Sequence, residues 1–431
     1  MEKTFRHNVF AIAVPAALQS LVQNSLTVID QVMIGQLGVV AIAATGFAGK
    51  YISIFQTVLT AAASGLGIFA AQYAGRKAYQ ESSALCHKIS RWSIAAVLLI
   101  GALSCLIPVM TLYTQDAADL AMDYLRIAIW SLPFHAFTVI YSVMLRCFGF
   151  PKEPFYASAI GIGANTLLNA LFIFGLNLGV QGAALATVLS SFLMSALVFY
   201  FTRKDLPWLM VKESSKVSLN ALFKVVLPLV LANFFWSLGE NVYMMVYGHT
   251  TLAGSAAMTM TVPIQSLYMG LLMGFSQAAG ILVGQDLGRS EDDLALVHSR
   301  DLMKLSFWCS LLLFALLACL APLYVRIYPV DEQTASTCIH LLLAFGLMSL
   351  VKVQNMVLGG GILRSGGHTG VLLGVDLTGT WVFGVPLAFL GLHLFKTQIT
   401  WIYLLLSSEE IIRYILCLII FRRRNWMSSL Q

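Results

Sequence analysis

Charged residues are scarce in this chain of 431 residues. Lys, Arg, Asp and Glu make up 11% of the sequence, whereas hydrophobic residues make up 58%. Soluble domains carry about 25% charged residues, so this scarcity excludes a protein whose main solvent is water. The net charge of +6 does not indicate a nucleic-acid partner, because nearly all of the basic residues fall in or near short connections between apolar segments.

The sequence also lacks the motifs of metal sites and enzymes. Its seven cysteines are scattered, with no CxxC or Cys/His cluster. We interpret them as small core residues and expect no structural metal and no cofactor. A membrane-embedded enzyme is the least favoured function, because the chain has no HExxH motif and no Ser/Lys or Cys/His arrangement at catalytic spacing. The glycine-rich segments 64–67 and 359–361 lack the lysine of a phosphate loop, and we expect them to permit close helix contacts or bending.

Long apolar runs are abundant instead. Many exceed the roughly 18 residues that cross a bilayer core, where backbone groups must be satisfied within helices. We therefore predict an all-α integral membrane protein with twelve transmembrane helices, the first of them retained and not removed as a signal peptide. The expected helices are Asn8–Gly35, Val40–Ala74, Ile89–Tyr113, Ala118–Phe148, Pro154–Leu176, Val180–Thr202, Asn220–Gly248, Gly254–Leu287, Val297–Tyr328, Thr334–Leu363, Thr369–Leu392 and Ile399–Phe421.

The two halves of the sequence resemble each other. Placing Pro15 on Pro228, a shift of 213 residues, aligns glycines and helix ends, and the shift has drifted only to 218 where Leu145 meets Leu363. Six helices in each half are an even number, which predicts two parallel repeats related by an axis along the membrane normal. Such a duplication places a transport pathway between the halves.

The basic residues predict how the chain is oriented. Most of the 26 lysines and arginines fall on the side shared by both termini, and only Arg326 and Lys396 fall on the other. Because basic loops stay in the cytoplasm, we expect a multi-pass protein of the cell membrane with both termini cytoplasmic. The expected domains are an N-lobe at 1–202 and a C-lobe at 220–431, joined by a cytoplasmic connection at 203–219.

A few ionisable residues lie inside the predicted helices. Asp30 follows a long apolar stretch in the first helix, and such residues mark ion or substrate paths or face a partner. The alternative is an interfacial aspartate, since Gly35 is near. Glu240 in the seventh helix, with Asn233 on the same face, is either functional or locally paired. Lys50 in the second helix either snorkels outward or pairs with Asp30.

Two polar sets follow helical spacing. Asn165 and Asn169 are four residues apart, hence on one face of the fifth helix. Glu409 and Glu410 lie half-way through the last helix, where we interpret them as structural residues that meet Arg413 one turn on.

Several segments together resemble the MATE family of multidrug and toxic-compound extrusion transporters. They are PAALQSLVQNSLTVIDQVMIGQLG in the first helix, AAQYAGR closing the second, NTLLNALFIFGLNLGVQGAALATVLS across the fifth and sixth, LPLVLANFFWSLGENVYMMVYG in the seventh, and GGGILRSGGHTGVLLGVDLTGTWVFGVPLAFLG across the tenth and eleventh. Within the family, the chain looks closer to bacterial branches of the DinF-like or NorM-like kind than to eukaryotic members. The resemblance implies an antiporter, in which Na⁺ or H⁺ enters while an organic, often cationic, compound leaves.

The resemblance also implies a coupling site. The family's first-helix aspartate matches Asp30, its fifth-helix acidic or amide partners match Asn165 and Asn169, and its sixth-helix threonine matches Thr187. These groups would supply oxygen ligands for a hard cation or a hydrogen-bonded carboxylate for a proton. Where some members have a second acid this chain has Asn169, which removes one negative charge and leaves the choice between H⁺ and Na⁺ open.

A substrate or second-ion site is expected, with three of its four candidate residues in the second half and Lys50 in the first. Asp376 in the eleventh helix matches the family, whereas Glu240 does not align with the family's usual seventh-helix glutamate. We assign Glu240, Asp376, Asn233 and Lys50 to this site. The expected partners are small organic substrates and the lipid bilayer, with the protein as a monomer and no nucleic acid. The alternative function is that of a flippase for lipid-linked saccharides, because such flippases belong to the same superfamily as the MATE transporters and resemble them in fold.

Overall fold

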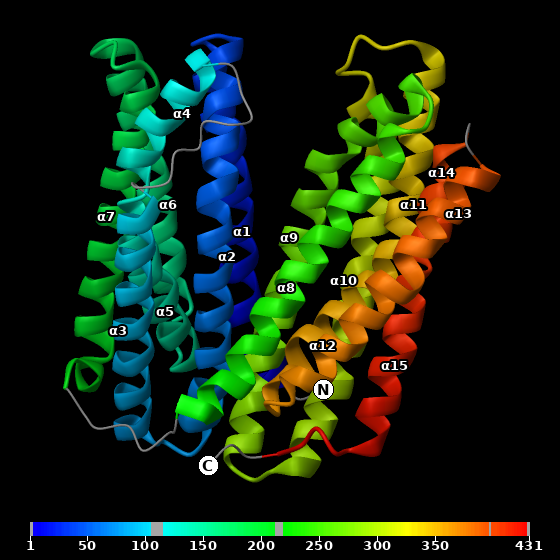
Figure 1. Ribbon diagram of the computed structural model, residues 1–431. Helices are drawn as coiled ribbons and strands as arrows, with labels where there is room; N and C mark the ends of the chain where they lie inside the picture. Colours follow the sequence, from blue (N-terminus) through cyan, green and yellow to red (C-terminus); the bar gives the residue numbers. More distant parts are fainter. Residues whose placement is uncertain (1–2, 105–114, 212–218, 396–397, 429–431) are drawn as a thin grey trace. The chain divides into compact units, whose positions relative to one another are not determined.

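The structure of the chain is a computed structural model that describes residues 3–104, 115–211, 219–395 and 398–428. Every regular element in these ranges is helical (Figure 1). The elements of the first half are α1 (Lys3–Gly35), α2 (Val39–Gly75), α3 (Tyr79–Ser104), α4 (Gln115–Ala128), α5 (Ser131–Cys147), α6 (Lys152–Asn169), η1 (Ala170–Gly175) and α7 (Gly179–Asp205).

The second half repeats this arrangement of long helices after a short 3₁₀ turn. That turn is η2 (Pro207–Met210), and the elements of the second half are α8 (Leu219–Gly248), α9 (Leu252–Gly288), α10 (Asp292–Val325), α11 (Glu332–Val357), η3 (Leu358–Leu363), α12 (Thr369–Leu377), η4 (Thr378–Gly384), α13 (Val385–Leu394), α14 (Ile399–Ser407) and α15 (Glu409–Arg423). The segments η1, η3 and η4 are π-helical, so they widen a continuing helix by one residue per turn.

The described helices confirm an all-α membrane protein. Nine of them are long and apolar enough to cross a bilayer, and the pair α4 and α5, bent by 48°, brings the number to ten. The predicted third span is α3 together with residues 105–113, which lie outside the described ranges, and the predicted twelfth is α14 followed by α15. Residues 212–218 of the predicted connection also lie outside them.

Three expected helices differ in the structure. The predicted helix Ala118–Phe148 was wrong as a single helix: it bends where α4 ends and α5 begins. Pro133, in the first turn of α5, has no N–H to donate to Ile129, and the Leu132 amide instead donates to the Ile129 carbonyl at 3.1 Å. The predicted twelfth helix is likewise interrupted, at Ser408.

Helix α3 begins at Tyr79, ten residues before the expected start at Ile89. Its first turns are polar, so apolar patterning did not find them, and they project beyond the expected span. They are held by a hydrogen bond from the Ser83 hydroxyl to the Val211 carbonyl, 2.7 Å long, which ties the start of α3 to the chain after η2.

The chain forms two compact units, which we describe separately. Residues 18–219 make up one, and residues 1–17 with 220–431 make up the other. In the first unit α2 packs against α3, α4 and α5, and α7 packs against α4, α5 and α6. Small residues allow the close approach that stabilises helices in lipid: a Cβ added to Gly67 would lie 3.0 Å from the Val143 Cγ1 atom.

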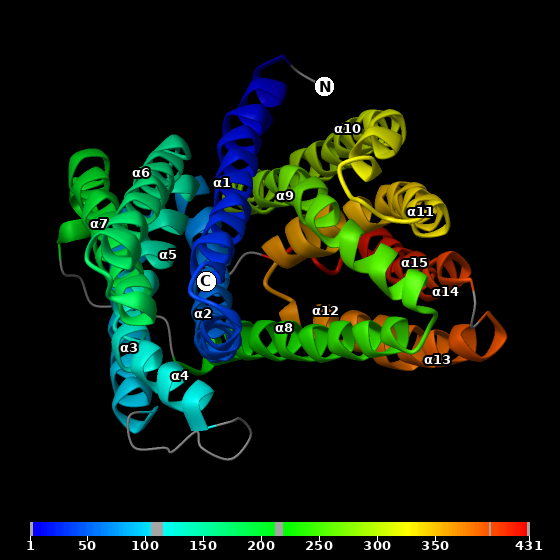
Figure 2. The same ribbon diagram turned by 90° about the horizontal axis from the view of Figure 1, so that it is seen from above.

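In the second unit α9, α10 and α11 pack against one another, and Figure 2 shows them side by side. The first turns of α1 belong to this unit: the Phe5 ring stacks on the His298 ring at 3.6 Å, and the Phe10 ring contacts the Phe275 ring edge-on. Segment η3 lies directly on α9. A Cβ added to Gly361 would lie 2.6 Å from the Ser276 carbonyl oxygen. This confirms that segment 359–361 permits close helix contact.

Substituting Gly361→Ala tests this contact. The added methyl group has no room against the α9 backbone, so we expect a loss of about 1–3 kcal/mol in the free energy of unfolding, as for other overpacked sites. Gly374→Ala, in the neighbouring α12, is the matched control because no atom lies within 4 Å of its added Cβ. Thermal unfolding of the purified protein in detergent measures both variants. Equal melting temperatures for the two would contradict the contact.

Candidate functional site

The Asp30 carboxylate lies in the second half of α1 and is half-buried. Its Oδ1 atom accepts a hydrogen bond of 2.7 Å from the Nδ2 atom of Asn169, the last residue of α6. The π-helical turn η1 begins at the next residue, and π-helical turns are frequent at functional sites. The structure therefore brings Asp30 and Asn169 together, as the family resemblance implied.

Asn169 extends the contact into a buried polar network. Its Nδ2 atom also donates to the Asn165 Oδ1 atom at 3.0 Å, and the Asn165 Nδ2 atom donates to the Ser190 hydroxyl of α7 at 3.1 Å. Both asparagines are almost fully buried. The Oδ1 atom of Asn169 is buried and accepts no hydrogen bond from any described residue. The site thus contains a carboxylate and a free amide oxygen, surrounded by neutral groups.

Thr187 lies beside this network. Its hydroxyl donates to the Ala183 carbonyl of its own helix at 3.0 Å, and its carbonyl accepts from the Ser190 hydroxyl at 3.1 Å. The Tyr124 side chain of α4 lies near both Thr187 and Asp30. Sequence reasoning missed Ser190 and Tyr124. Ser190 could have been found from its spacing of three residues after Thr187, whereas nothing in the local pattern points to Tyr124.

Lys50 is not part of this network. It is exposed on α2, its carbonyl accepts from the Ser53 hydroxyl at 2.7 Å, and no ion pair between Lys50 and Asp30 occurs among the described residues. The sequence left open whether Lys50 snorkels outward or pairs with Asp30. In the structure Lys50 is exposed and does not contact Asp30.

A second polar cluster lies in the other unit, between α8, α11, η4 and α15. We call Tyr243, Thr380, Glu409, Glu410 and Arg413 the C-unit cluster. The Glu409 Oε2 atom accepts from the Tyr243 hydroxyl at 2.6 Å, and the Arg413 guanidinium pairs with Glu409 at 3.3 Å and Glu410 at 3.9 Å. Arg413 also donates to the Thr380 hydroxyl. The predicted pairing of the two glutamates with Arg413 is confirmed.

Two glycines make room for these charges. A Cβ added to Gly379 would collide with the Arg413 side chain, and one added to Gly384 would collide with Glu409 and Tyr243. Both glycines belong to η4. The π-helical segment therefore presents bare backbone to the cluster, which lets the carboxylate and the guanidinium pack against it. On the other side, the Asn355 Nδ2 atom donates to the Glu410 carboxylate at 2.7 Å.

Glu240 and Asp376 lie around this cluster. Glu240 is within electrostatic range of Lys352, Glu410 and Arg413. Asp376 is within range of Arg413, Arg364 and Glu410. The Lys352 Nζ atom lies 5.9 Å from the centre of the Tyr403 ring.

Asn233 stands apart from these groups. It is half-buried on α8, on the same face as Glu240, and no hydrogen bond joins the two in the described part of the chain. The group around the cluster contains one more carboxylate than basic side chains: Glu240, Asp376, Glu409 and Glu410 face Lys352, Arg364 and Arg413.

Arg413→Gln should destabilise the protein strongly, because it leaves two buried carboxylates without their cation. We expect a loss of about 3–5 kcal/mol in the free energy of unfolding. The double substitution Glu409→Gln with Arg413→Gln removes one of the two charges as well and should recover part of that loss. Arg422→Gln, an exposed arginine at the end of the same helix, is the control. A melting temperature for Arg413→Gln equal to that of the control would show that the pairing contributes nothing.

Comparison with known proteins finds one family and many relatives. The MatE family model matches residues 15–171 and again residues 228–390. The two matches begin at the residues that the repeat alignment places on each other. The chain is 23% identical to "Probable multidrug resistance protein NorM" of Thermotoga maritima, over 98% of this chain and 93% of that protein. It is 24% identical to "Multidrug resistance protein MdtK" of Edwardsiella ictaluri, over 90% and 89%.

Solved structures show the same fold. A Pyrococcus furiosus transporter of the MOP superfamily superposes with a TM-score of 0.86 at 18% identity, covering 98% of this chain and 96% of that one. The Vibrio cholerae MATE transporter VcmN in its bent form gives 0.88 at 17% identity, covering 99% of each chain. Since the family model matches most of the sequence in two copies and the fold agrees over nearly all of it, the chain belongs to the MatE family of multidrug efflux transporters.

Proposed function

We propose that this protein is a cation-coupled antiporter that extrudes organic, cationic amphipathic compounds across the cell membrane, and that Asp30 is its coupling residue. Family membership and relatives named multidrug resistance proteins support the transport of small organic compounds. The coupling assignment is carried by one observation: Asp30 is a half-buried carboxylate that accepts a hydrogen bond from a neutral amide, that of Asn169.

The chemistry of the Asp30 site favours a cation as its ligand. An ionised carboxylate inside a membrane span is costly unless a partner compensates its charge. Asn169 and Asn165 can orient the carboxylate but cannot neutralise it. A proton on Asp30 would neutralise it directly, and Na⁺ would do so while using the free Asn169 Oδ1 atom as a further oxygen ligand. Either cation can be bound and released as the site becomes exposed to one side and then the other.

We assign substrate binding or a second ion to the other unit. The surplus carboxylate around the C-unit cluster favours a cationic partner. Glu240 is the best placed of the four acids, because it is exposed on α8 whereas Glu409 and Glu410 are buried against Arg413. Asp376 and Asn233 belong to this proposal as flanking polar groups. Lys50, on α2 of the first unit, belongs to it as a further candidate residue.

The orientation follows from the basic residues. The last helix ends in Arg422 and Arg423, and Arg424 follows it. The last turn of α7 contains Arg203 and Lys204. Placing these residues in the cytoplasm puts both termini there as well. In this orientation a monomer would take up its substrate from the cytoplasm or inner leaflet and release it outside by alternating access between the halves.

Asp30→Asn tests the coupling residue, because it keeps the shape and the hydrogen bonding of the side chain while removing its charge. In everted vesicles with Na⁺ and pH gradients imposed separately, we expect gradient-driven efflux of ethidium to be abolished. Asp123→Asn is the matched control: this acid lies on α4, accepts a 3.1 Å hydrogen bond from Gln181, and lies outside the network. Uphill transport by Asp30→Asn at the wild-type rate would rule out Asp30 as the coupling residue.

Glu240→Gln in the same vesicles separates substrate recognition from coupling. If Glu240 contacts cationic compounds, the apparent affinity for ethidium should fall while the dependence on the imposed gradient remains. Unchanged affinity for this variant, and for Asp376→Asn beside it, would assign both acids a structural role.

A further inference from the structure

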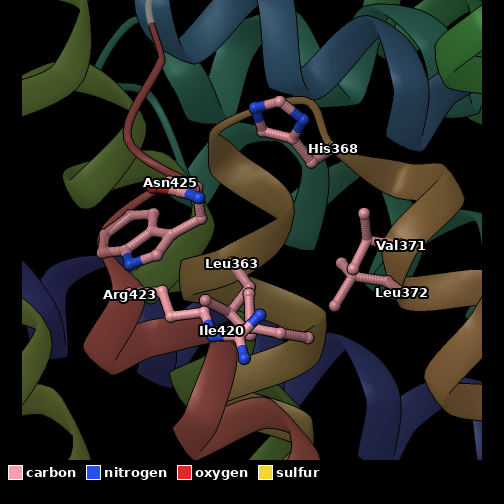
Figure 3. Close-up of a pocket in the computed structure, with 8 residues that line it drawn as sticks. Leu363, His368, Val371, Leu372, Ile420, Arg423 and Asn425 are labelled. Atoms are coloured by element: carbon pink, nitrogen blue, oxygen red, sulfur yellow. The ribbon is translucent and has the colours of Figure 1, made fainter.

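A pocket lies at the end of the second unit where α15 finishes and α12 starts (Figure 3). Its volume is about 250 Å³. It is lined by Leu363, His368, Val371, Leu372, Ile420, Arg423, Asn425 and Trp426. In Figure 3 His368 lies on one side, Val371 and Leu372 on a second, and Ile420 and Arg423 rise from α15 on a third. None of these residues belongs to the sites described above.

The segment after α15 builds one wall of this pocket. Arg424 has a left-handed backbone conformation that ends the helix and turns the chain back. Trp426 is then almost fully buried, its ring stacks on Phe421 at 5.6 Å, and its indole N–H donates to the Phe421 carbonyl at 3.2 Å. The Ser428 hydroxyl donates to the Gly366 carbonyl at 2.7 Å.

Gly366 makes this docking possible. A Cβ at this position would collide with the Trp426 carbonyl oxygen. The Ser428 hydroxyl also lies 3.2 Å from the His368 Nε2 atom, which places that ring at the pocket. The chain beyond the last span is therefore held against the α11–α12 connection by specific contacts. These contacts fix the wall that closes the pocket.

The polar part of the pocket is basic. Arg423 is exposed and makes no ion pair among the described residues, and no Asp or Glu lines the pocket. His368 and the Asn425 amide are its other polar groups. Arg422 and Arg424, the sequence neighbours of Arg423, are exposed and do not line the pocket. An arginine guanidinium with free donors is well suited to bind a phosphate through two parallel hydrogen bonds.

The remaining walls are apolar. Leu363, Val371, Leu372, Ile420 and Trp426 are hydrocarbon surfaces with one indole, and Trp is enriched where a bilayer meets water. The pocket lies at this boundary, because it is formed where one membrane helix ends and another begins. A free phosphate ion would leave these apolar walls unused, whereas a phospholipid would place its headgroup on Arg423 and its glycerol and upper acyl chain against them.

We propose that this pocket binds the phosphate headgroup of an anionic phospholipid. Basic pockets between membrane helices bind such headgroups, and the local excess of arginine adds attraction for a net negative lipid over a zwitterionic one. Arg423 supplies the direct phosphate contact. Gly366 and Trp426 position the segment that closes the pocket. Lipid occupancy would in turn hold the C-terminal segment on α12, which continues through η4 to the C-unit cluster.

Native mass spectrometry and thermal unfolding of the full chain in detergent test the site with three probes. Phosphatidylglycerol should be retained and should raise the melting temperature, because a ligand that binds only the folded state stabilises it. Phosphatidylcholine and inorganic phosphate at the same concentration should do so much less. Arg423→Gln should weaken phosphatidylglycerol binding about tenfold, the effect of one charge-assisted contact. Arg422→Gln, its neighbour outside the pocket, should not.

Two further variants keep the test decisive. Arg423→Lys retains the charge and should retain part of the binding. Gly366→Ala displaces Trp426 and should lose the lipid although all three arginines remain. Equal losses for Arg422→Gln and Arg423→Gln would show diffuse attraction to the arginine run and overturn the site. Stabilisation by inorganic phosphate equal to that by phosphatidylglycerol would assign the pocket to a free anion and overturn the lipid.

Discussion

Placing carboxylates inside a membrane is the constraint on which this structure depends. The chain meets it in two ways. In the first unit Asp30 contacts the neutral amide of Asn169, so its charge is oriented but not cancelled. In the second unit Glu409 and Glu410 are buried against Arg413, so a fixed cation compensates part of their charge in place. The first arrangement fits the exchangeable cation that we propose for Asp30, and the second joins η4 and α15 through the Arg413 contacts.

The repeat makes this difference informative. Under the shift of 213 residues, the position of Asp30 in the first half corresponds to Tyr243 in the second. The Tyr243 hydroxyl donates to Glu409 at 2.6 Å. The symmetric position is therefore a hydrogen-bond donor to a structural carboxylate, and Glu240, the exposed acid of α8, lies about one helical turn, roughly 5 Å, away. The two halves match the same family model but treat buried carboxylates differently: Asp30 has a neutral partner, whereas Glu409 and Glu410 have a cationic one.

The sequence was sufficient to predict the contacts that follow helical periodicity. Asn165 and Asn169 share a face because they are four residues apart, and Arg413 reaches Glu409 for the same reason. The contact between Asp30 and Asn169 joins two helices, and only the family resemblance indicated it.

The remaining features arise from packing between distant segments. Thr380 meets Arg413 because π-helical η4 is widened and glycine-lined, and composition alone does not signal a π-helical turn. The bend at Pro133 was readable in principle, since a proline in a helix removes a donor, but the apolar run continues through it. The pocket closed by Trp426 depends on a chain reversal after the last span, where no hydrophobic pattern remains.

The most direct test of cation coupling is to run the transporter in reverse in proteoliposomes that contain only the purified protein. A gradient of substrate alone should drive H⁺ or Na⁺ in the opposite direction, detected by an internal pH- or Na⁺-sensitive dye, and Asp30→Asn should abolish that cation flux. Substrate movement down its gradient with no opposing flux of either cation in the wild-type protein would contradict the account.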